Sequence, residues 1–425
     1  MIDAATGLTG SFSTKDTAFL RYNVSYDRTN YDVLLNVRPT FTDFSHYATT
    51  SNQRSVGCAL NDLLQDPSGC GDDVLEAMYN LPDGAAVREA YNQMMPQDAL
   101  GQSEIIRNAM NQYSESVFGR MDNIRNGGQY AMSGDSRYLL AGASNSLALR
   151  PKTNEWMPFA KGFGVWGDRN GDSDIAGYQY NIYGLAGGVD KLVSENTLFG
   201  LSVGGSWANV DYSQPGTSAN IDSAVCSLYG SYFMDDWHLG LTLGYGHSWY
   251  DSQRGIPFIG RHADSDHQGN AYSAAVELGN NFGGTSMILE PVVGLGYTVV
   301  QEESYKEKGA DALNLKVDSD TTDGIYSKLG IRLAKELKNQ NMTLVPNVRA
   351  FWIHDFADRV ELSSSFIGGG SFTTEGLDPV HDMFNIGAGL NVYYNKNLRL
   401  FVDYGWQSAS SFNSNTVQLG AQWSF

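Results

Sequence analysis

The feature that most constrains the fold of this chain is a series of long strand-like segments in its C-terminal part. From residue 156 onward, apolar and polar residues alternate in about twelve runs, and most of these runs are longer than the strands of soluble proteins. They span 156–168, 178–193, 196–211, 219–235, 236–251, 270–282, 285–301, 323–338, 341–354, 382–394, 397–410 and 415–425. The alternation gives each strand two faces in different surroundings.

The connections between these runs also alternate, between tight and mostly long. The tight ones lie at Ser194–Glu195, Asp235–Asp236, Gly283–Gly284, Asn339–Gln340 and Asn395–Lys396, and the longer ones around 169–177, 212–218, 252–269, 302–322 and 355–381. In an up-and-down antiparallel sheet every second connection lies at the same rim, as in outer-membrane barrels. An even strand number then brings the first and last strands together. We therefore predict an all-β membrane barrel of about twelve antiparallel strands over residues 156–425.

The last predicted strand supports closure of such a barrel. It places Val417, Leu419, Ala421, Trp423 and Phe425 on one face, with polar or small residues between them. In a soluble protein a chain end usually frays, so this apolar surface would be wasted. In a barrel the backbone of the last strand pairs with the first strand, and its apolar face meets lipid. A soluble β-sandwich would also alternate, but it needs neither such long strands nor a terminal aromatic.

Composition limits the function further. The formal net charge of −19 argues against nucleic-acid binding, which needs a basic surface. No segment approaches the roughly 20 continuous apolar residues of a membrane helix, but barrel strands do not need one because their two faces average to neutral hydropathy. No export signal follows Met1, so we expect either a cytoplasmic chain or the C-terminal part of a longer exported one.

The residues before the barrel divide into two parts. Residues 1–48 carry two short alternating runs, AFLRYNVSYD and YDVLLNVRP, that predict strands of an all-β unit. Residues 49–155 are predicted to be a helical junction, because apolar residues recur there at helical spacing. Its longest helix is expected over about 103–125, ending before Gly127–Gly128, and a linker rich in Gly, Ser and Asn is expected over 126–155.

Several charged residues of the strands are predicted to face the lumen, because a membrane barrel keeps charge away from lipid. By strand parity they are Glu277, Glu290, Lys328, Arg332, Arg349, Arg399 and Asp403. They could simply pair with one another in a wet lumen. They could also hold the predicted helix, in which case its three arginines would meet acids of the wall. These arginines are Arg107, Arg120 and Arg125, and the candidate acids are Glu277, Glu290 and Asp403.

No motif for catalysis, a cofactor or a metal stands out. His247 and Ser248 are neighbours on one strand and therefore point to opposite faces, which spoils the simplest hydrolase pair. No P-loop and no His/Asp spacing typical of a metal site occurs. An outer-membrane lipid hydrolase and a passive porin-like channel remain alternatives, although the helical region disfavours a porin. Cys58 and Cys70 could pair in an oxidising compartment, leaving Cys226 alone, or stay unpaired.

Several segments resemble the C-terminal β-domain of autotransporters, the type V secretion system. PFAKGFGVWGDRNGDSDIAGYQYNIYGLAGGVDKL resembles its opening hairpin, SLYGSYFMDDWHLGLTLGYG a following strand pair, and NIGAGLNVYYNKNLRLFVDYGWQ with the final QWSF its closing strands. Upstream, FLRYNVSYDRTNYDVLLNV resembles the last rungs of the parallel β-helix that many passengers form, and TSNQRSVGCALNDL resembles the helical segment that often follows.

The resemblance implies a non-enzymatic translocator that exports its own passenger and anchors it at the cell surface. It implies that residues 1–48 end the passenger and that the helix before the barrel plugs the pore. It also implies that the barrel assembly machinery recognises the closing strand with its terminal Phe425, and we expect periplasmic chaperones, outer-membrane lipid and a monomeric barrel. Some autotransporters cleave themselves near an Asn of this helix. Asn108, Asn111 and Asn123 lie on it, but no cleavage motif stands out.

Overall fold

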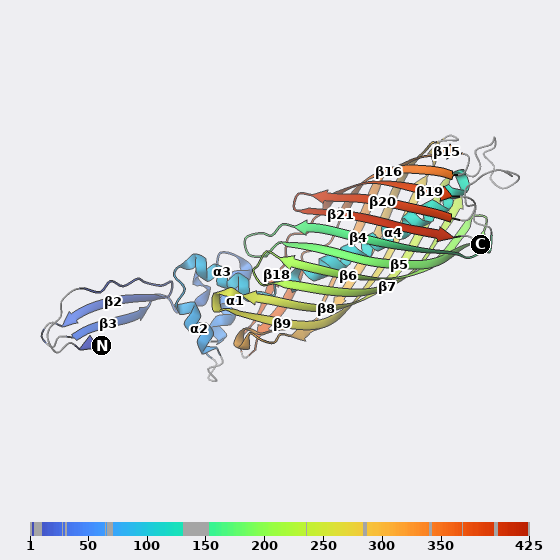
Figure 1. Ribbon diagram of the computed structural model, residues 1–425. Helices are drawn as coiled ribbons and strands as arrows, with labels where there is room; N and C mark the ends of the chain where they lie inside the picture. Colours follow the sequence, from blue (N-terminus) through green and yellow to red (C-terminus); the bar gives the residue numbers. More distant parts are fainter. Residues whose placement is uncertain are drawn as a thin grey trace.

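The computed structural model describes residues 2–3, 11–27, 29, 32–63, 65, 71–130, 153–234, 236–283, 287–339, 342–367, 369–394 and 398–423. Within them, twelve long β-strands form a closed antiparallel barrel. Small helices cover one end of the barrel, a long helix lies inside it, and an N-terminal hairpin projects beyond the small helices (Figure 1).

Each barrel strand pairs antiparallel with its neighbours in sequence, and the last strand pairs with the first. The strands are β4 (Met157–Arg169), β5 (Tyr178–Ser194), β6 (Thr197–Tyr212), β7 (Ser218–Met234), β8 (Trp237–Ile256), β9 (Arg261–Asn280), β11 (Met287–Glu302), β14 (Asp320–Lys335), β16 (Met342–Asp355), β19 (Asp382–Tyr394), β20 (Leu398–Ala409) and β21 (Phe412–Trp423). Short strands β10 (Phe282–Gly283) and β15 (Leu337–Asn339) extend two hairpins at the tight-turn rim. The predicted barrel of about twelve strands is therefore confirmed.

The outer surface of the barrel is apolar, as the alternation predicts. Along β8, Leu239, Leu241 and Leu243 are exposed on the outside, while the glycine and threonine residues between them face inward. Aromatic side chains are exposed near both rims. They include Trp207, Trp249, Tyr297, Trp352 and Trp406 toward the loops, and Tyr232, Trp237, Tyr394 and Trp423 toward the tight turns. Two such belts fit the interfaces on either side of a membrane.

The connection expected to be a long loop over 252–269 is mostly strand. β8 continues to Ile256 and β9 begins at Arg261, and between them lies only the turn η2 (Pro257–Ile259) with Gly260 at φ 68°. The hairpin rises beyond the lipid-facing wall, where its inner residues Ile256 and Ala263 are buried in a core shared with the small helices. The outward residues of this part of the hairpin are polar. The apolar–polar alternation that marks a lipid-facing strand therefore ends before the two strands themselves end.

Two other loops contain strands that the sequence did not predict. β12 (Tyr305–Lys306), β13 (Leu315–Val317), β17 (Glu361–Phe366) and β18 (Ser371–Glu375) form a four-stranded sheet, with η3 (Asp311–Leu313) beside it. The long connections are therefore ordered structures at the loop rim.

The small helices lie on these loops. They are η1 (Phe44–Tyr47), α1 (Ser51–Leu63), α2 (Asp72–Tyr79) and α3 (Gly84–Met94), and we call them the helical cap. Their buried apolar residues, such as Leu60 and Met94, share a core with Leu313 of η3 and Phe366 of β17. The side chain of Asn52 exchanges hydrogen bonds of 2.9 and 2.8 Å with the backbone of Glu375. The helical cap and the loops thus fold onto each other.

The long helix α4 (Ala99–Tyr130) is longer at both ends than the predicted 103–125. It begins three residues after Pro96 and continues through Gly127–Gly128, so the prediction that these glycines end it was wrong. Glycine lowers helix stability by about 1 kcal/mol relative to alanine, but it removes no hydrogen-bond donor. Among the described residues, no helix combines the length and apolar character that crossing a membrane requires.

The N-terminal strands pair antiparallel. β2 (Leu20–Asp27) and β3 (Asp32–Pro39) form a hairpin, and β1 (Ile2–Asp3) adds to β3, also antiparallel. We expected parallel β-helix rungs within residues 1–48, but the described residues form antiparallel strands instead. A short connection between two strands favours a hairpin, whereas parallel pairing needs a long crossover or a preceding coil.

Several expectations fall outside the described residues. These are the terminal Phe425, the side chains of Arg125 and Asn123, Cys70, and the predicted linker from residue 131 to residue 152. Cys58 lies on α1 as an exposed free thiol.

A buried ion pair joins β8 to the loop between β12 and β13, and the same arginine, Arg254, donates to the Gln93 carbonyl of the helical cap at 2.8 Å. The Arg254 guanidinium at the end of β8 donates to both carboxylate oxygens of Glu307, at 2.8 and 2.6 Å, and to the Leu313 carbonyl at 2.9 Å. Asp98, directly before α4, lies nearby and is 1 % exposed. Burial, followed by the negative charge of Glu307, raises the pKa of Asp98 to about 6. The ionised form of Asp98 is thus disfavoured in the folded protein.

We predict that Asp98→Asn stabilises the helical cap at pH 7.5 by at most about 3 kcal/mol and changes little at pH 4. The folded pKa lies above the unfolded value, so the penalty for ionisation is complete above pH 6 and disappears as the pH falls through about 3.9. The change in stability is measured at each pH by hydrogen exchange of the α3 amides, with the rates corrected for the intrinsic exchange rates. Glu76→Gln, at an exposed position on α2, is the control. An equal gain at both pH values would contradict the prediction.

Candidate functional site

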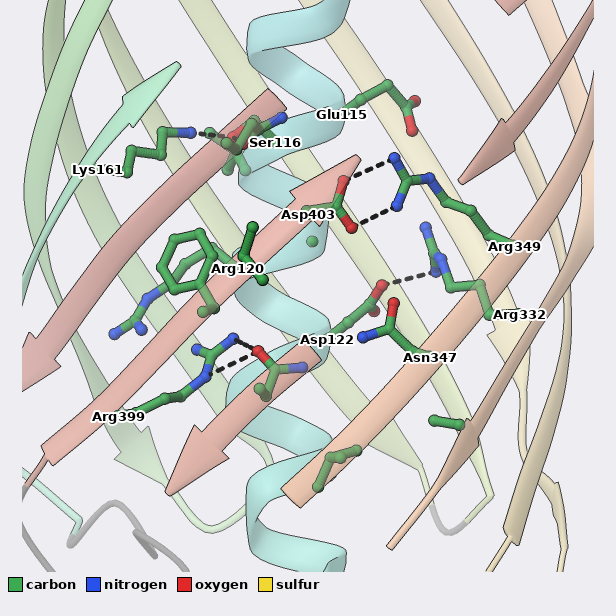
Figure 2. A pocket seen from close by; sticks show the side chains of 18 of the residues that line it. Glu115, Ser116, Arg120, Asp122, Lys161, Arg332, Asn347, Arg349, Arg399 and Asp403 are labelled. Atoms are coloured by element: carbon green, nitrogen blue, oxygen red, sulfur yellow. Dashed lines mark hydrogen bonds and ion pairs between the residues drawn. The ribbon is translucent and has the colours of Figure 1, made fainter. Parts of the chain in front are cut away.

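The helix α4 runs through the lumen and lies along β7, β8, β9 and β11. Figure 2 shows the helix enclosed by barrel strands. One side of the helix is apolar and packs closely on the wall. Glycines of β8 make this approach possible: a Cβ at Gly240 would lie 3.1 Å from the Phe118 ring, and one at Gly246 would lie 3.1 Å from the Met110 sulfur. Side chains at these positions would crowd the helix.

The other side of α4 faces a cavity of about 160 Å³, which is lined by charged and apolar side chains together. Its lining includes Glu115 and Arg120 of the helix and Arg332, Arg349 and Asp403 of the wall (Figure 2). A cavity of this size with polar groups in its lining can hold several water molecules. One side of the helix therefore packs on the wall through apolar contacts, and the other side borders a cavity with room for water.

Two basic residues of α4 bind acids of the wall. Arg107 pairs with Asp355 at the loop-side end of β16. Further along, Arg120 donates to both oxygens of Asp190 on β5, at 2.8 and 2.9 Å, and the Tyr229 hydroxyl donates to the same carboxylate at 2.8 Å. Arg120 and Asp190 are both buried, so this charge-assisted pair is shielded from water.

Two acidic residues of α4 form ion pairs of the opposite polarity, with basic residues of the wall. Glu115 accepts from Lys328 at 2.6 Å, and Asp122 lies 2.7 Å from Arg332. The same two cations of β14 also contact Glu277, each at 2.7 Å. The helix is thus tethered along its length by ion pairs of both polarities.

The partners differ from those that the sequence suggested. Arg107 and Arg120 do not meet the candidate acids Glu277, Glu290 and Asp403. Those acids face basic residues of the wall itself: Arg332 contacts Glu277 at 2.7 Å and Glu290 at 3.3 Å. Arg349 and Asp403 form a bidentate pair at 2.7 and 2.8 Å.

The buried Arg399 is the remaining member of the predicted lumen set, and it donates to Asn391 at 2.5 Å. All the described members of that set therefore face inward, as parity predicts. Their arrangement depends on how β9, β11, β14, β16 and β20 are placed side by side, which strand parity alone does not give.

The closing strand β21 has a different role on each face. Leu419 and Trp423 are exposed on the outside, and Val417 and Ala421 share their side of the strand. On the inside, polar side chains bind α4. Gln418 accepts from Ser116 at 2.9 Å, Gln422 accepts from Arg120 at 2.5 Å, and Thr416 donates to Gln112 at 3.1 Å.

Sequence analysis missed several members of this site. Asp190 and Lys161 could have been found by strand parity, which places Asp190 on the inner face with Tyr178 and Tyr180, and Lys161 on the inner face with Phe159. In the structure Lys161 contacts Ser116 of the helix. Asp355 could not, because it is the last residue of its strand, where alternation no longer indicates a side.

Comparison with known proteins identifies this arrangement. A protein-family model described as Autotransporter beta-domain matches residues 158–405, which is more than half of the chain. The chain belongs to the autotransporter family. Its barrel is the outer-membrane translocator of an autotransporter, whose passenger is at the cell surface.

The curated relatives of this autotransporter are longer than the chain. "Extracellular serine protease" of Serratia marcescens is 24% identical over 463 residues, which cover 99% of this chain and 42% of that protein. "Outer membrane protein B" of Rickettsia prowazekii is 21% identical over 440 residues, covering 97% of this chain and 26% of that protein. The chain thus spans about two fifths or less of the length of these relatives.

Two solved autotransporter domains share the fold. The translocator domain of autotransporter NalP from Neisseria meningitidis has a TM-score of 0.55 at 16% identity and covers 75% of this chain and 98% of that one. The beta domain of the Bordetella autotransporter Brka has a TM-score of 0.51 at 18% identity and covers 64% of this chain and 100% of that one. At these identities the likeness concerns the fold alone.

We predict that Arg120→Met loosens α4 in the lumen. The change leaves the buried Asp190 carboxylate without its cation, which costs roughly 3–5 kcal/mol for pairs of this kind. Single-channel recordings in planar bilayers should therefore show openings of the barrel pore at least ten times as often as for the original chain. Arg349→Met is the matched control, because Arg349 pairs with Asp403 between two wall strands. Equal effects of the two variants would mean that the Arg120 pair does not hold the helix.

Proposed function

We propose that this chain exports its own passenger and keeps it attached to the cell. In this proposal residues 1–48 are the end of the passenger, residues 49–155 join it to the barrel through the pore helix, and residues 156–425 form the translocator. The observation that carries the proposal is the course of the chain. α4 starts at the loop rim beside the helical cap and runs through the lumen, whereas β4 starts at the tight-turn rim (Figure 1).

In this proposal the part of the chain before α4 belongs to the loop side. Loops of outer-membrane barrels face outward and tight turns face the periplasm, so the helical cap and the N-terminal hairpin lie outside the cell. A chain that folds in this way has passed through its own barrel. The ion pairs of Arg107, Arg120, Glu115 and Asp122 with the wall then keep the last segment in place, which explains anchoring.

The driving force we infer is folding on the outer side. The helical cap has its apolar core only when its residues lie against the loop strands, as Leu60 and Met94 do against Leu313 and Phe366. Burial of each such side chain contributes about 1.5–3 kcal/mol. Cap residues that reach the outside therefore become trapped there, and no nucleotide is needed.

The alternatives receive no support from the lumen. A passive porin-like channel needs an open pore, but α4 occupies this one. A lipid hydrolase needs a serine beside a base. Ser202 lies in a Gly-x-Ser-x-Gly pentapeptide, but it is in the middle of β6 and its hydroxyl contacts the hydroxyls of Tyr113 and Ser227, each at 2.7 Å. We therefore propose that the barrel and its helix act without catalytic chemistry.

The proposal predicts which tags are accessible on intact cells. The chain is expressed behind an export signal, with an epitope tag before residue 11, at Gly260 in the β8–β9 turn, or at Glu195 in the β5–β6 turn. Antibody should reach the first two tags on intact cells, because both lie on the loop side. It should reach the Glu195 tag only after the outer membrane is permeabilised. The reverse pattern would contradict the proposal.

The partners of the barrel follow from its surface. The apolar wall and its aromatic belts suit outer-membrane lipid. Because the chain closes its own ring through β21 and β4, we propose a monomeric barrel. We further propose that periplasmic chaperones deliver the unfolded chain. We also propose that the barrel assembly machinery reads the alternating apolar residues at the end of the sequence, Val417, Leu419, Ala421, Trp423 and Phe425.

We predict that deleting Phe425, or replacing it by Ser, impairs membrane insertion out of proportion to its stability cost. A single exposed residue normally contributes well under about 1 kcal/mol, but a terminal aromatic read by the assembly machinery would decide whether insertion begins. The measurement is the amount of folded barrel in the outer membrane relative to the amount of degradation products in the periplasm. Tyr394→Ser, which removes an exposed aromatic from the same rim of another strand, should insert normally. Normal insertion without Phe425 would refute its role as a signal.

A further inference from the structure

Four metal-ligating side chains from four separate elements meet in the lumen. Asp122 comes from α4, His238 from β8, Glu277 from β9 and Glu290 from β11. All four are buried, and one ligand atom from each lies within 4.8 Å of the others. The three wall residues lie near the tight-turn ends of adjacent strands, so the cluster lies in the part of the lumen next to the tight-turn rim.

His238 gives this cluster its character. The residue is 2 % exposed, and neither ring nitrogen has a hydrogen-bond partner among the described residues. Its Nε2 atom points into the carboxylates, at 3.3 Å from Glu290, 3.6 Å from Glu277 and 3.9 Å from Asp122. A buried polar group without a hydrogen bond costs about 1–3 kcal/mol. A metal ion bound through Nε2 would remove the deficit at that nitrogen.

The distances from His238 to the carboxylates approach those of tetrahedral coordination. Ligand atoms about 2.0–2.2 Å from a zinc ion lie roughly 3.3–3.6 Å from one another in a tetrahedron, and two of the three His238 distances fall in this range. Small rotations of the Asp122 side chain would bring the third into it. One imidazole with three carboxylates is a donor set for a first-row dication, and zinc binds such sets more tightly than manganese or iron(II).

Two neighbouring cations, Arg332 and Lys328, hold the carboxylates in place. Arg332 donates to Glu277 through both terminal nitrogens, at 2.7 and 2.8 Å, and Lys328 donates to Glu277 at 2.7 Å. Metal-ligating carboxylates commonly accept hydrogen bonds from outer groups, which fix their orientation. However, one Arg332 nitrogen also lies 2.7 Å from Asp122 and 3.3 Å from Glu290. The guanidinium is therefore the natural competitor for the same oxygens.

We propose that Asp122, His238, Glu277 and Glu290 form a divalent transition-metal site, with Zn²⁺ as its best-suited occupant, that bridges α4 and the barrel wall. Three ligands are fixed on adjacent wall strands and the fourth belongs to the helix, so the metal closes a cross-link that exists only when α4 occupies the lumen. The site stands apart from passenger export, since the folded chain binds the metal whether or not it exports anything.

The test uses the full chain folded in detergent, stripped of metal with a chelator and then equilibrated with Zn²⁺. We expect one Zn²⁺ per chain by elemental analysis after dialysis. His238→Ala removes the imidazole, Glu290→Gln removes a wall carboxylate and Asp122→Asn removes the helix ligand. Each variant should raise the dissociation constant at least tenfold. Slower migration of the boiled than of the unboiled sample shows that each variant is folded.

Two matched variants separate this site from casual binding. His354→Ala removes another histidine that lies beside an acid, since His354 is 2.9 Å from Asp382 at the loop end of β16. Asp403→Asn removes a lumen carboxylate outside the cluster. Both should bind Zn²⁺ as the original chain does. No stoichiometric Zn²⁺, or unchanged binding in His238→Ala and Glu290→Gln, would overturn the proposal and leave Arg332 as the cation of the cluster. Unchanged binding in Asp122→Asn alone would overturn the bridge to α4.

Discussion

The pairing of β21 with β4 is the constraint on which the rest of the structure depends. Eleven residue pairs join the two strands, from Phe412 opposite Arg169 to Gln422 opposite Phe159. Without this pairing two edges of the sheet would present backbone N–H and C=O groups to hydrocarbon, where each unsatisfied group costs several kcal/mol. Closure also separates an outside from an inside. The apolar outer face, the polar lumen and the two different rims all follow from it.

Once the ring is closed, the lumen needs a filling that matches both its apolar and its polar sides, and α4 supplies it. Apolar residues pack against glycines of β8, while arginine and acidic residues pair with the wall. The pairs are of both polarities along the helix, and a rotation or a shift by one turn would separate them. Buried ion pairs contribute little net stability, but broken ones are costly. In this lumen we infer that they select one position of the helix.

The strands and the barrel could be predicted from the sequence because they rest on local signals: alternation with period two and the lengths of the connections. The helix ends and the partners of the charges could not. Arg120 meets Asp190 of β5 because of the rotation of α4 about its own axis in the lumen, and that rotation depends on the whole wall. Asp122, His238, Glu277 and Glu290 come from four separate elements, and Asp122 precedes the other three by more than a hundred residues. No spacing in the sequence could therefore reveal the cluster.

The loop strands mark the clearest limit of local signals and explain the asymmetry of the two rims. β13 and β17 are short strands, whose stability comes from residues such as Leu315 and Leu362 in the core shared with the helical cap. Strands this short are not stable alone, so the loop sheet and the cap each depend on the other. At the tight-turn rim nothing comparable is needed, because the turns only reverse the chain. The loop rim is therefore the end at which a segment that has passed through the pore finds a surface to fold against.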